Sequence, residues 1–216
     1  WDNMKELPMV LGIDEFRGNT NGEKFQVILT DPENHKVLDI LPRRTENYLL
    51  EYFLSFPKEK RGEVKFFVSD MYKPYAEIAK KCFPNAIYIV DRYHWIRQQI
   101  WAFENIRKRE QKRLGKNHRL YFKRCRELLL KHFSELDDDQ RQTVFNILSL
   151  SDDLRTAYYY KERLYALWDE QDIAKKKRSF VQITDAMKQS GIEELERCAN
   201  TYYNWLPQIL TSLEYS

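Results

Sequence analysis

Two aspartates of this sequence each end an apolar segment, and together they could hold a divalent cation. Asp14 follows the apolar run that begins at Pro8, and Asp70 follows the run from Val64 to Ser69. A carboxylate at the tip of a buried strand loses hydration energy unless it accepts hydrogen bonds or binds a cation. Two such placements in one small domain suggest a shared metal site, which is typical of phosphoryl transfer. We therefore expect the two carboxyl groups to lie within about 6 Å of each other.

Three further residues could support the same chemistry. Glu15 follows the first aspartate and points to the opposite face of a regular strand, where we expect it in solvent or in an ion pair. Asp91 and His94 lie three residues apart, so they share one face if a helix begins there. His94 could then donate to a carboxylate or contact a phosphate. A helix-capping aspartate beside a structural histidine explains this pair equally well, and capping also explains Asp70 taken alone.

The elements that must position these residues alternate between strand and helix patterns over the first ninety residues. Three strands are predicted first, at 8–14, 25–30 and 36–41, with a hairpin turn between the last two. A helix, a strand, a helix and a strand follow, at 45–56, 64–69, 74–83 and 86–90. This order, β-β-β-α-β-α-β, predicts an α/β fold with a mixed sheet. From residue 93 onward the apolar period is helical almost throughout, which predicts an all-helical remainder.

Basic charge is concentrated in one stretch of the predicted helices. Residues 97–131 hold twelve Lys or Arg and three Glu, a local charge of +9, whereas the whole chain carries only +3. A localised basic surface interleaved with aromatic residues suits duplex DNA, although a solvated helix face is the ordinary explanation of a charge run. The residues that we expect to contact DNA are Arg97, Arg107, Lys108, Arg109, Lys112, Arg113, Lys116, Arg119, Lys123 and Arg124.

Composition narrows the class of protein further. The longest apolar runs are too short to cross a bilayer, so we expect no membrane partner. Cys82, Cys125 and Cys198 are widely spaced and predict reduced core thiols of a cytoplasmic protein. The chain begins at Trp1 without a signal-peptide pattern, and we interpret it as a piece of a longer polypeptide.

Three local sequences together resemble one enzyme family. LGIDEF (11–16), VSDMYKPYAEIAKKCFPNA (68–86) and VDRYHWIRQ (90–98) are similar to the DDE transposases of bacterial insertion sequences, specifically the ISL3 group. The similarity extends over essentially the whole chain. It implies an RNase H-like catalytic core at 1–95 and a large all-α insertion at 96–216.

The resemblance also implies roles for the site residues. Asp14 and Asp70 would be the first two members of an acidic triad that binds two Mg²⁺ or Mn²⁺ ions, and Asp91 and His94 match an Asp-x-x-His signature of such enzymes. The implied reaction is cleavage at transposon ends followed by strand transfer to target DNA, carried out by a homo-oligomer on double-stranded DNA in a bacterial cytoplasm.

The third acid of such a triad is not evident in this sequence. The resemblance places it in an Asn-Gly-x-x-Glu type motif after the insertion, and no such motif occurs. The available substitutes are Glu193, Glu194, Glu196 and Glu214. We therefore expect the chain alone to be inactive. Two alternatives stay open: an RNase H-like nuclease without strand transfer, and a non-catalytic DNA-binding fragment of a transposase.

Overall fold

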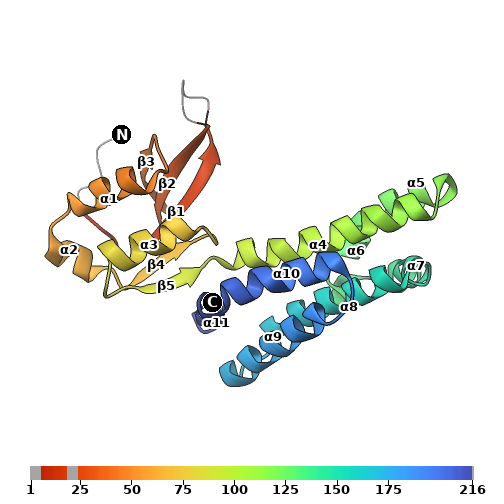
Figure 1. Ribbon diagram of the computed structural model, residues 1–216. Helices are drawn as coiled ribbons and strands as arrows, with labels where there is room; N and C mark the ends of the chain where they lie inside the picture. Colours follow the sequence, from red (N-terminus) through yellow and green to blue (C-terminus); the bar gives the residue numbers. More distant parts are fainter. Residues whose placement is uncertain (1–5, 19–23, 216) are drawn as a thin grey trace. The chain divides into compact units, whose positions relative to one another are not determined.

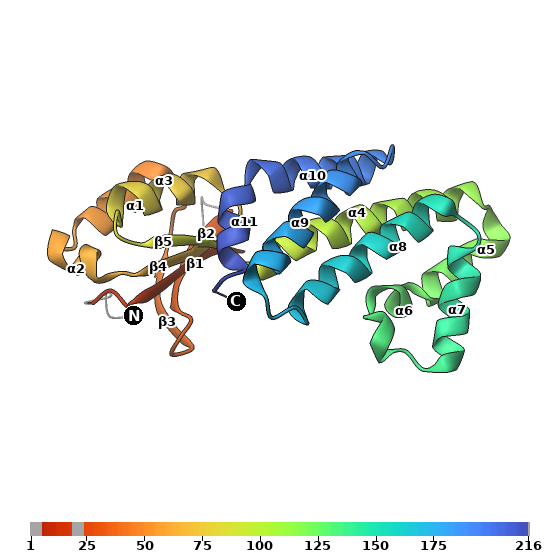
Figure 2. The same cartoon turned by 90° about the horizontal axis from the view of Figure 1, so that it is seen from below.

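A computed structural model describes residues 6–18 and 24–215, and it leaves the side chains of residues 116–119 undescribed. The chain divides into two compact units. The first unit runs to His94 and includes Tyr215, and the second runs from Trp95 to Glu214. Figures 1 and 2 show their elements in two views. The roles assigned above to residues 1–95 and 96–216 stay predictions, although the division between the two units falls close to that boundary.

The first unit is built on a five-stranded mixed sheet, which confirms the predicted α/β class. Its strands lie in the order β3-β2-β1-β4-β5. Strand β1 is antiparallel to β2 and parallel to β4, while β2 pairs antiparallel with β3 and β4 pairs parallel with β5. The bounds are Val10–Arg17 (β1), Phe25–Asp31 (β2), Lys36–Leu41 (β3), Phe66–Ser69 (β4) and Ile87–Val90 (β5).

Two helices cover one face of this sheet, α1 (Glu46–Leu54) and α3 (Lys73–Cys82) (Figure 1). The apolar side chains of alternate strand residues pack against them, as the period of two in a strand requires. The shared core comprises Leu11, Ile13, Val27, Leu29, Leu41, Leu49, Phe53, Phe67, Ile78, Ala79, Cys82 and Phe83. Pro74 lies in the first turn of α3 as predicted, since its missing N–H costs nothing there.

One helix of this unit was not predicted. Helix α2 spans Lys58–Glu63, directly after Pro57, where the sequence was expected to continue without a helix into the next strand. None of its residues is buried. A helix that is polar all round has no apolar period, which is why the sequence pattern missed it.

A glycine in β1 lets two strands approach closely. A Cβ added at Gly12 would lie 2.3 Å from Thr30 Oγ1 and 3.1 Å from Pro32 Cγ. Because real Cβ atoms do not come that close, a larger residue would clash with the side chain of Thr30, its partner on β2. Gly12 thereby makes room for that side chain two residues before Asp14.

The second unit is entirely helical among its described residues, as predicted. Its long first helix is α4, and α8, α9 and α10 pack in sequence order beside one another (Figures 1 and 2). The bounds are Arg92–Arg113 (α4), Lys116–Arg124 (α5), Arg126–Leu130 (α6), Phe133–Glu135 (η1), Asp138–Leu148 (α7), Asp152–Tyr165 (α8), Ala166–Trp168 (η2), Ile173–Lys188 (α9), Glu193–Asn204 (α10) and Leu206–Ser212 (α11).

Aromatic side chains form the centre of this helical unit. The Trp95 ring lies 5.3 Å from the Phe180 ring and 6.0 Å from the Tyr202 ring, and the Tyr202 hydroxyl donates to the Trp95 carbonyl at 2.9 Å. All three side chains are fully buried. The phenol therefore adds apolar area to the core while its polar end stays hydrogen-bonded.

The three cysteines are buried and free, in agreement with the prediction of reduced core thiols. None of the described helices combines the length and apolar character needed to cross a membrane.

Candidate functional site

Asp14 lies within β1, and Asp70 directly follows the adjacent parallel strand β4. The predicted end of the first strand at Asp14 was wrong, because β1 continues to Arg17 through its pairing with β2. The register of β1 and β4 pairs Gly12 with Val68 and Ile13 with Ser69, so one of the two aspartates follows each residue of the last pair. Neighbouring strands are about 4.8 Å apart, which places the two backbones side by side. The two carboxylates also interact electrostatically, because the negative charge of Asp14 raises the pKa of Asp70.

Asp70 is the more buried of the two acids and the less satisfied. Its Oδ1 atom is buried and has no hydrogen-bond partner among the described residues. Burial raises the pKa of the Asp70 carboxyl to about 6, and the nearby positive charges of His94 and Arg44 only partly counteract this. An unpaired buried carboxylate is costly, so this placement needs a compensating ligand.

His94 faces the first aspartate. Its Nε2 atom lies 3.7 Å from Asp14 Oδ2, and the histidine side chain is 18% exposed while that of the aspartate is 50% exposed. The Asp14 carboxylate, as a hydrogen-bond acceptor, raises the pKa of His94, although burial opposes the charged form. The protonated imidazole is therefore favoured beside these two acids, and it offers an N–H donor to them.

Asp91 serves as the helix cap that the sequence allowed. Its carboxylate accepts a hydrogen bond from the Tyr93 backbone N–H at 2.8 Å, immediately before α4 begins. The cap satisfies one of the free N–H groups of the first helical turn. It thereby fixes the start of the helix that carries His94 three residues later.

Glu15 forms an ion pair on the helix-covered side of the sheet. Its Oε2 atom accepts a hydrogen bond from Arg44 Nη1 at 2.5 Å, and the glutamate side chain is 22% exposed. The Arg44 guanidinium also stacks 4.5 Å from the centroid of the Phe25 ring. Nothing in the sequence singled out Arg44, because it lies in a loop and only the β1–β2–β3 pairing brings it close.

Three further side chains beside Asp70 were missed by the sequence analysis. The Ser69 hydroxyl donates to the Asp70 carbonyl at 2.9 Å, and the Tyr88 hydroxyl lies 2.7 Å from Ser69 Oγ and donates to the same carbonyl at 3.1 Å. The Tyr75 hydroxyl is buried without a hydrogen-bond partner among the described residues. Tyr75 could have been found from its spacing to Ile78 and Cys82, which defines the buried face of α3.

The donor set of this end of the sheet suits a hard divalent cation. Asp14 and Asp70 directly follow a pair of neighbouring residues on adjacent parallel strands, and Asp70 Oδ1 is buried without a partner among the described residues. Oxygen ligands of this kind are those that Mg²⁺ and Mn²⁺ prefer. Two protein carboxylates leave a cation dependent on other ligands, and no group of three or more His, Cys, Asp or Glu that could hold a metal occurs in the described part of the chain.

Three of the four acids considered as a third ligand form ion pairs elsewhere. Glu193 pairs with Arg197, Glu194 Oε2 lies 3.3 Å from Arg109 Nη1, and Glu214 Oε2 lies 2.6 Å from Lys177 Nζ. All these contacts fall inside the helical unit. The described contacts therefore give no support to any of these three carboxylates as the third metal ligand.

Several basic residues expected to bind DNA form ion pairs within the helical unit. Arg107 is buried and donates to Glu104 at 2.8 and 3.1 Å, so its guanidinium does not face solvent. Arg109 lies 2.5 Å from Asp153, and Arg113 lies 2.7 Å from Glu110. Arg107 and Arg113 pair within α4, and Arg109 joins α4 to α8, an engagement that neither the DNA prediction nor the alternative of a solvated helix face foresaw.

Other members of the basic stretch are exposed. Lys108 and Lys112 lie on the exposed surface of α4, and Lys123 and Arg124 on that of α5. Arg97 is exposed as well, and its guanidinium stacks 4.4 Å from the centroid of the Trp101 ring. The predicted contacts at Lys116 and Arg119 fall on side chains outside the described ones.

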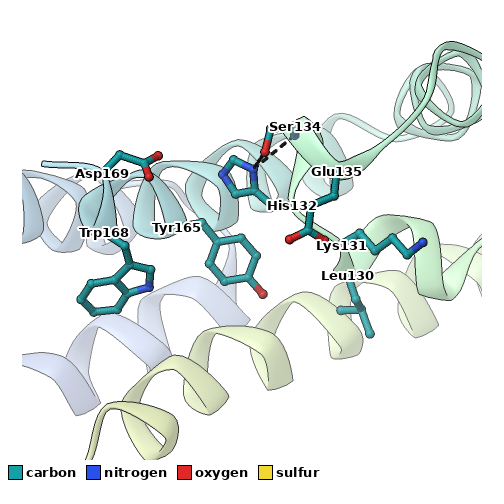
Figure 3. Close-up of a pocket in the computed structure, with 8 residues that line it drawn as sticks. All are labelled: Leu130, Lys131, His132, Ser134, Glu135, Tyr165, Trp168 and Asp169. Carbon is teal, nitrogen blue, oxygen red and sulfur yellow. Dashed lines mark hydrogen bonds between the residues drawn. The ribbon is translucent and has the colours of Figure 1, made fainter. Parts of the chain in front are cut away.

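A hollow of about 430 Å³ lies in the helical unit, away from all the predicted site residues. Figure 3 shows Tyr165 and Trp168 on one side of it and the turn with His132, Ser134 and Glu135 on the other. The fully buried Lys161 supports that turn, since its Nζ donates to the Leu129 and Lys131 carbonyls at 2.9 and 2.5 Å. These contacts tie the turn to α8, which carries Lys161.

Comparison with known proteins gives two matches. The sequence profile of a family described as Transposase, the ISL3 group, matches residues 11–216. The chain is also 25% identical over 213 residues to the transposase for insertion sequence element IS1001 of Bordetella parapertussis. That alignment covers 97% of this chain and 51% of the relative, so the chain spans about half the length of the curated relative it matches. No solved structure matches the chain.

Proposed function

Because the chain belongs to the ISL3 family of transposases, we propose that its first unit is an RNase H-like catalytic core of the DDE type, acting on DNA strands. The observation that carries the proposal is the parallel register that pairs Ile13 with Ser69, the residues directly before Asp14 and Asp70, with Asp70 Oδ1 buried and without a partner among the described residues. The proposed substrates are transposon ends and target DNA, and the complete polypeptide would act as a homo-oligomer on them.

Each residue of the site has a separate part in this proposal. Asp14 and Asp70 would hold Mg²⁺ or Mn²⁺, which supplies activation of the attacking hydroxyl and stabilisation of the leaving oxygen when bound. The raised pKa of His94 favours its charged form, which would place an N–H donor beside Asp14. Asp91 fixes the helix that carries His94, and the Arg44 ion pair keeps the Glu15 carboxylate turned away from solvent.

Strand cleavage and joining by the complete polypeptide test the catalytic part of the proposal. Asp14→Asn and Asp70→Asn each remove a charged oxygen ligand at nearly constant volume, so both should abolish Mg²⁺-dependent cleavage and leave DNA affinity within about threefold, since duplex affinity comes mainly from phosphate contacts. Asp138→Asn is the matched control, because that side chain is 99% exposed in the helical unit. Substantial cleavage by either site variant would refute the assignment.

The same assay separates the remaining alternatives. Joining of a cleaved 3′ end to target DNA supports a transposase, whereas cleavage without joining would indicate a nuclease. Because no third carboxylate joins Asp14 and Asp70 among the described residues, we expect the 216-residue chain alone to bind DNA without cutting it. Cleavage by the chain alone would make Glu214 or an acid of the 193–196 cluster the third ligand.

The DNA surface is proposed to consist of the exposed basic residues Arg97, Lys108, Lys112, Lys123 and Arg124. Replacing Lys108, Lys112, Lys123 and Arg124 by Gln should lower the slope of log K against log salt by about 3 to 4, since each lost phosphate contact removes roughly one counterion. Gln at four exposed lysines outside this stretch, Lys58, Lys65, Lys80 and Lys188, is the charge-matched control. Equal slopes in the two quadruple variants would refute the surface.

A further inference from the structure

A small cavity lies between α4 and α10 of the helical unit and has a composition unlike that of the core around it. Its volume is about 180 Å³. The side chains that line it are one indole, two carboxamides, a hydroxyl, a guanidinium, a carboxylate and two small residues: Trp101, Gln98, Asn105, Thr201, Arg197, Glu194, Ala102 and Cys198. Pockets for drug-sized ligands measure roughly 300–1,000 Å³, so this one has room for a single compact group.

The indole that forms one wall is accessible. Trp101 is 47% exposed, a large fraction for an aromatic side chain that is mostly apolar. The Arg97 guanidinium covers part of the ring, 4.4 Å from its centroid, but Arg97 does not line the cavity. Trp101 thus contributes an accessible aromatic side chain to the cavity lining, the kind of group on which a flat ligand stacks.

The charges around the cavity disfavour a phosphate group. The Arg197 guanidinium is paired with Glu193, and the Glu194 carboxylate is part of the lining. An anion would meet a guanidinium already paired with Glu193 and a carboxylate already paired with Arg109, so the lining offers it no unpaired cation among the described residues. A neutral planar group does not need such a cation.

The carboxamides match the edge of a nucleobase. Gln98 and Asn105 lie on α4 on either side of Trp101, and each offers both a donor and an acceptor. A carboxamide can bond the two polar atoms on one edge of adenine, and a carboxylate can accept from the amino group of cytosine. Aromatic walls with such polar groups bind bases that have left the stack.

We propose that this cavity binds one unpaired nucleobase, stacked on Trp101 and held at its edge by Gln98 and Asn105. The proposal rests on the proposed function in one respect, that DNA is the partner. It adds a site for a base next to the basic surface proposed to contact phosphates, since the Arg97 guanidinium of that surface lies 4.4 Å from the Trp101 ring centroid.

The experiment uses the 216-residue chain and three oligonucleotides: a blunt duplex, the same duplex with a short overhang that contains 2-aminopurine, and that overhang with an abasic position instead. Trp101→Ala should weaken overhang binding by about 5- to 100-fold, the range that loss of one base–aromatic stack gives, and abolish 2-aminopurine quenching. Blunt-duplex affinity should stay within about twofold, because phosphate contacts dominate it. The parent chain should bind the abasic overhang as weakly as Trp101→Ala binds the intact one.

Two further variants guard against a purely structural effect. Trp101→Phe keeps an aromatic wall and should restore most of the overhang affinity, and Asn105→Ala should reduce the preference for one base over another while stacking is kept. Tyr159→Ala is the matched control, because Tyr159 is also an exposed aromatic, 53% accessible, with the Arg163 guanidinium 5.7 Å from its ring. Tyr159 does not line the cavity, so its loss should leave overhang binding unchanged.

The outcomes distinguish this inference from the proposed function. Salt-dependent duplex binding without any effect of the overhang base or of Trp101→Ala overturns the inference alone. Base-dependent binding by the chain, together with a complete polypeptide that cuts no DNA, supports the inference and overturns the proposed catalysis. A loss of self-association in Trp101→Ala with unchanged DNA binding would assign the cavity to a protein side chain and overturn the inference.

Discussion

Each unit removes carboxylate oxygen from solvent, at the half-buried Asp70 in the first unit and at the buried Glu104 in the second, and the two carboxylates differ in their partners. In the first unit, Asp70 Oδ1 is buried without a partner among the described residues, and burial raises the pKa of this carboxyl to about 6. In the helical unit, Glu104 is buried as well, but it accepts hydrogen bonds from Arg107 and from Arg126, both at 2.8 Å. Burial alone would raise the pKa of Glu104, yet the two arginines outweigh it and hold the pKa below its ordinary value.

This difference distinguishes Glu104, whose carboxylate stabilises the fold, from Asp70, whose carboxylate is proposed to bind a ligand. A buried acid with two arginine partners is fully compensated and stabilises the charged form. A buried acid without a partner is a cost to the folded state, and such costs cluster at functional sites. The contrast therefore supports the proposed role of Asp70 from energetics, independently of the family.

The largest expected effect is the loss of the Glu104 charge. Glu104→Gln leaves the Arg107 side chain, 6% exposed, buried beside a neutral amide. Removing one partner of a buried ion pair typically costs about 3–5 kcal/mol, so we expect a destabilisation of about 3 kcal/mol with one hydrogen bond kept. Urea unfolding followed by tryptophan fluorescence measures it, because Trp95, Trp101, Trp168 and Trp205 lie in the helical unit. An effect below about 1 kcal/mol would contradict the comparison.

The next effect is a pH dependence at Asp70 in metal-free buffer. The folded carboxyl, with its pKa of about 6, keeps a proton that the unfolded carboxyl, with an ordinary pKa of 3.8, has released. Stability therefore falls as pH rises from 3.8 to 6, and the penalty is complete at neutral pH. Asp70→Asn should gain about 2 kcal/mol over the parent chain between these limits, less than the full shift would give because water screens the group.

Hydrogen exchange of the β4 amides, measured across that pH range, reports the stability of the first unit. It is preferred to tryptophan fluorescence, which reports mainly on the helical unit. Glu104 provides the opposite sign, because a lowered pKa means that its stabilisation is lost as pH falls below its ordinary value of 4.5. If the protection of the β4 amides changed with pH equally in the parent chain and in Asp70→Asn, ionisation of Asp70 would not destabilise the fold, and the prediction would be wrong.

A divalent cation should remove the penalty at Asp70 and leave Glu104 unaffected. At neutral pH, Mg²⁺ or Mn²⁺ at ten times its dissociation constant should stabilise the first unit by about 1.4 kcal/mol, from mass action alone. Asp14→Asn and Asp70→Asn should each abolish this gain, whereas Glu104→Gln should keep it. Calorimetric titration with Mn²⁺ gives the affinity directly, and a gain that survives in both aspartate variants would place the cation elsewhere.

The smallest effect is expected at the outer partner of Glu104. Arg126 is 48% exposed, so water replaces its guanidinium at little cost when it is removed. Arg126→Gln should destabilise the chain by about 0.5–1 kcal/mol, in the range of exposed ion pairs, and the loss should shrink in 1 M salt. Equal losses for Arg126→Gln and Glu104→Gln would mean that burial does not decide the strength of this network.

Part of this protein could be predicted from local sequence. The apolar runs before Asp14 and Asp70 predicted strands, and the 3.6-residue period after residue 93 predicted an all-helical remainder. Both signals are local, because a strand or a helix face shows its burial in its own spacing. The same spacing offered Asp91 as a helix cap, since the residue types that satisfy free N–H groups are few.

Pairing between distant segments decided the rest. The parallel register of β1 and β4 brings Asp14 and Asp70 together across more than fifty residues, and the contact of His94 with Asp14 spans a longer separation. Arg44 pairs with Glu15 because the pairing of the hairpin strands brings their segments together. Arg107 was predicted from the sequence to bind DNA, but it is buried and donates to Glu104. Sequence fixes which side chains are charged or apolar, but whether a charge meets solvent, a partner or an empty position depends on desolvation, and desolvation is set by the packing of the whole unit.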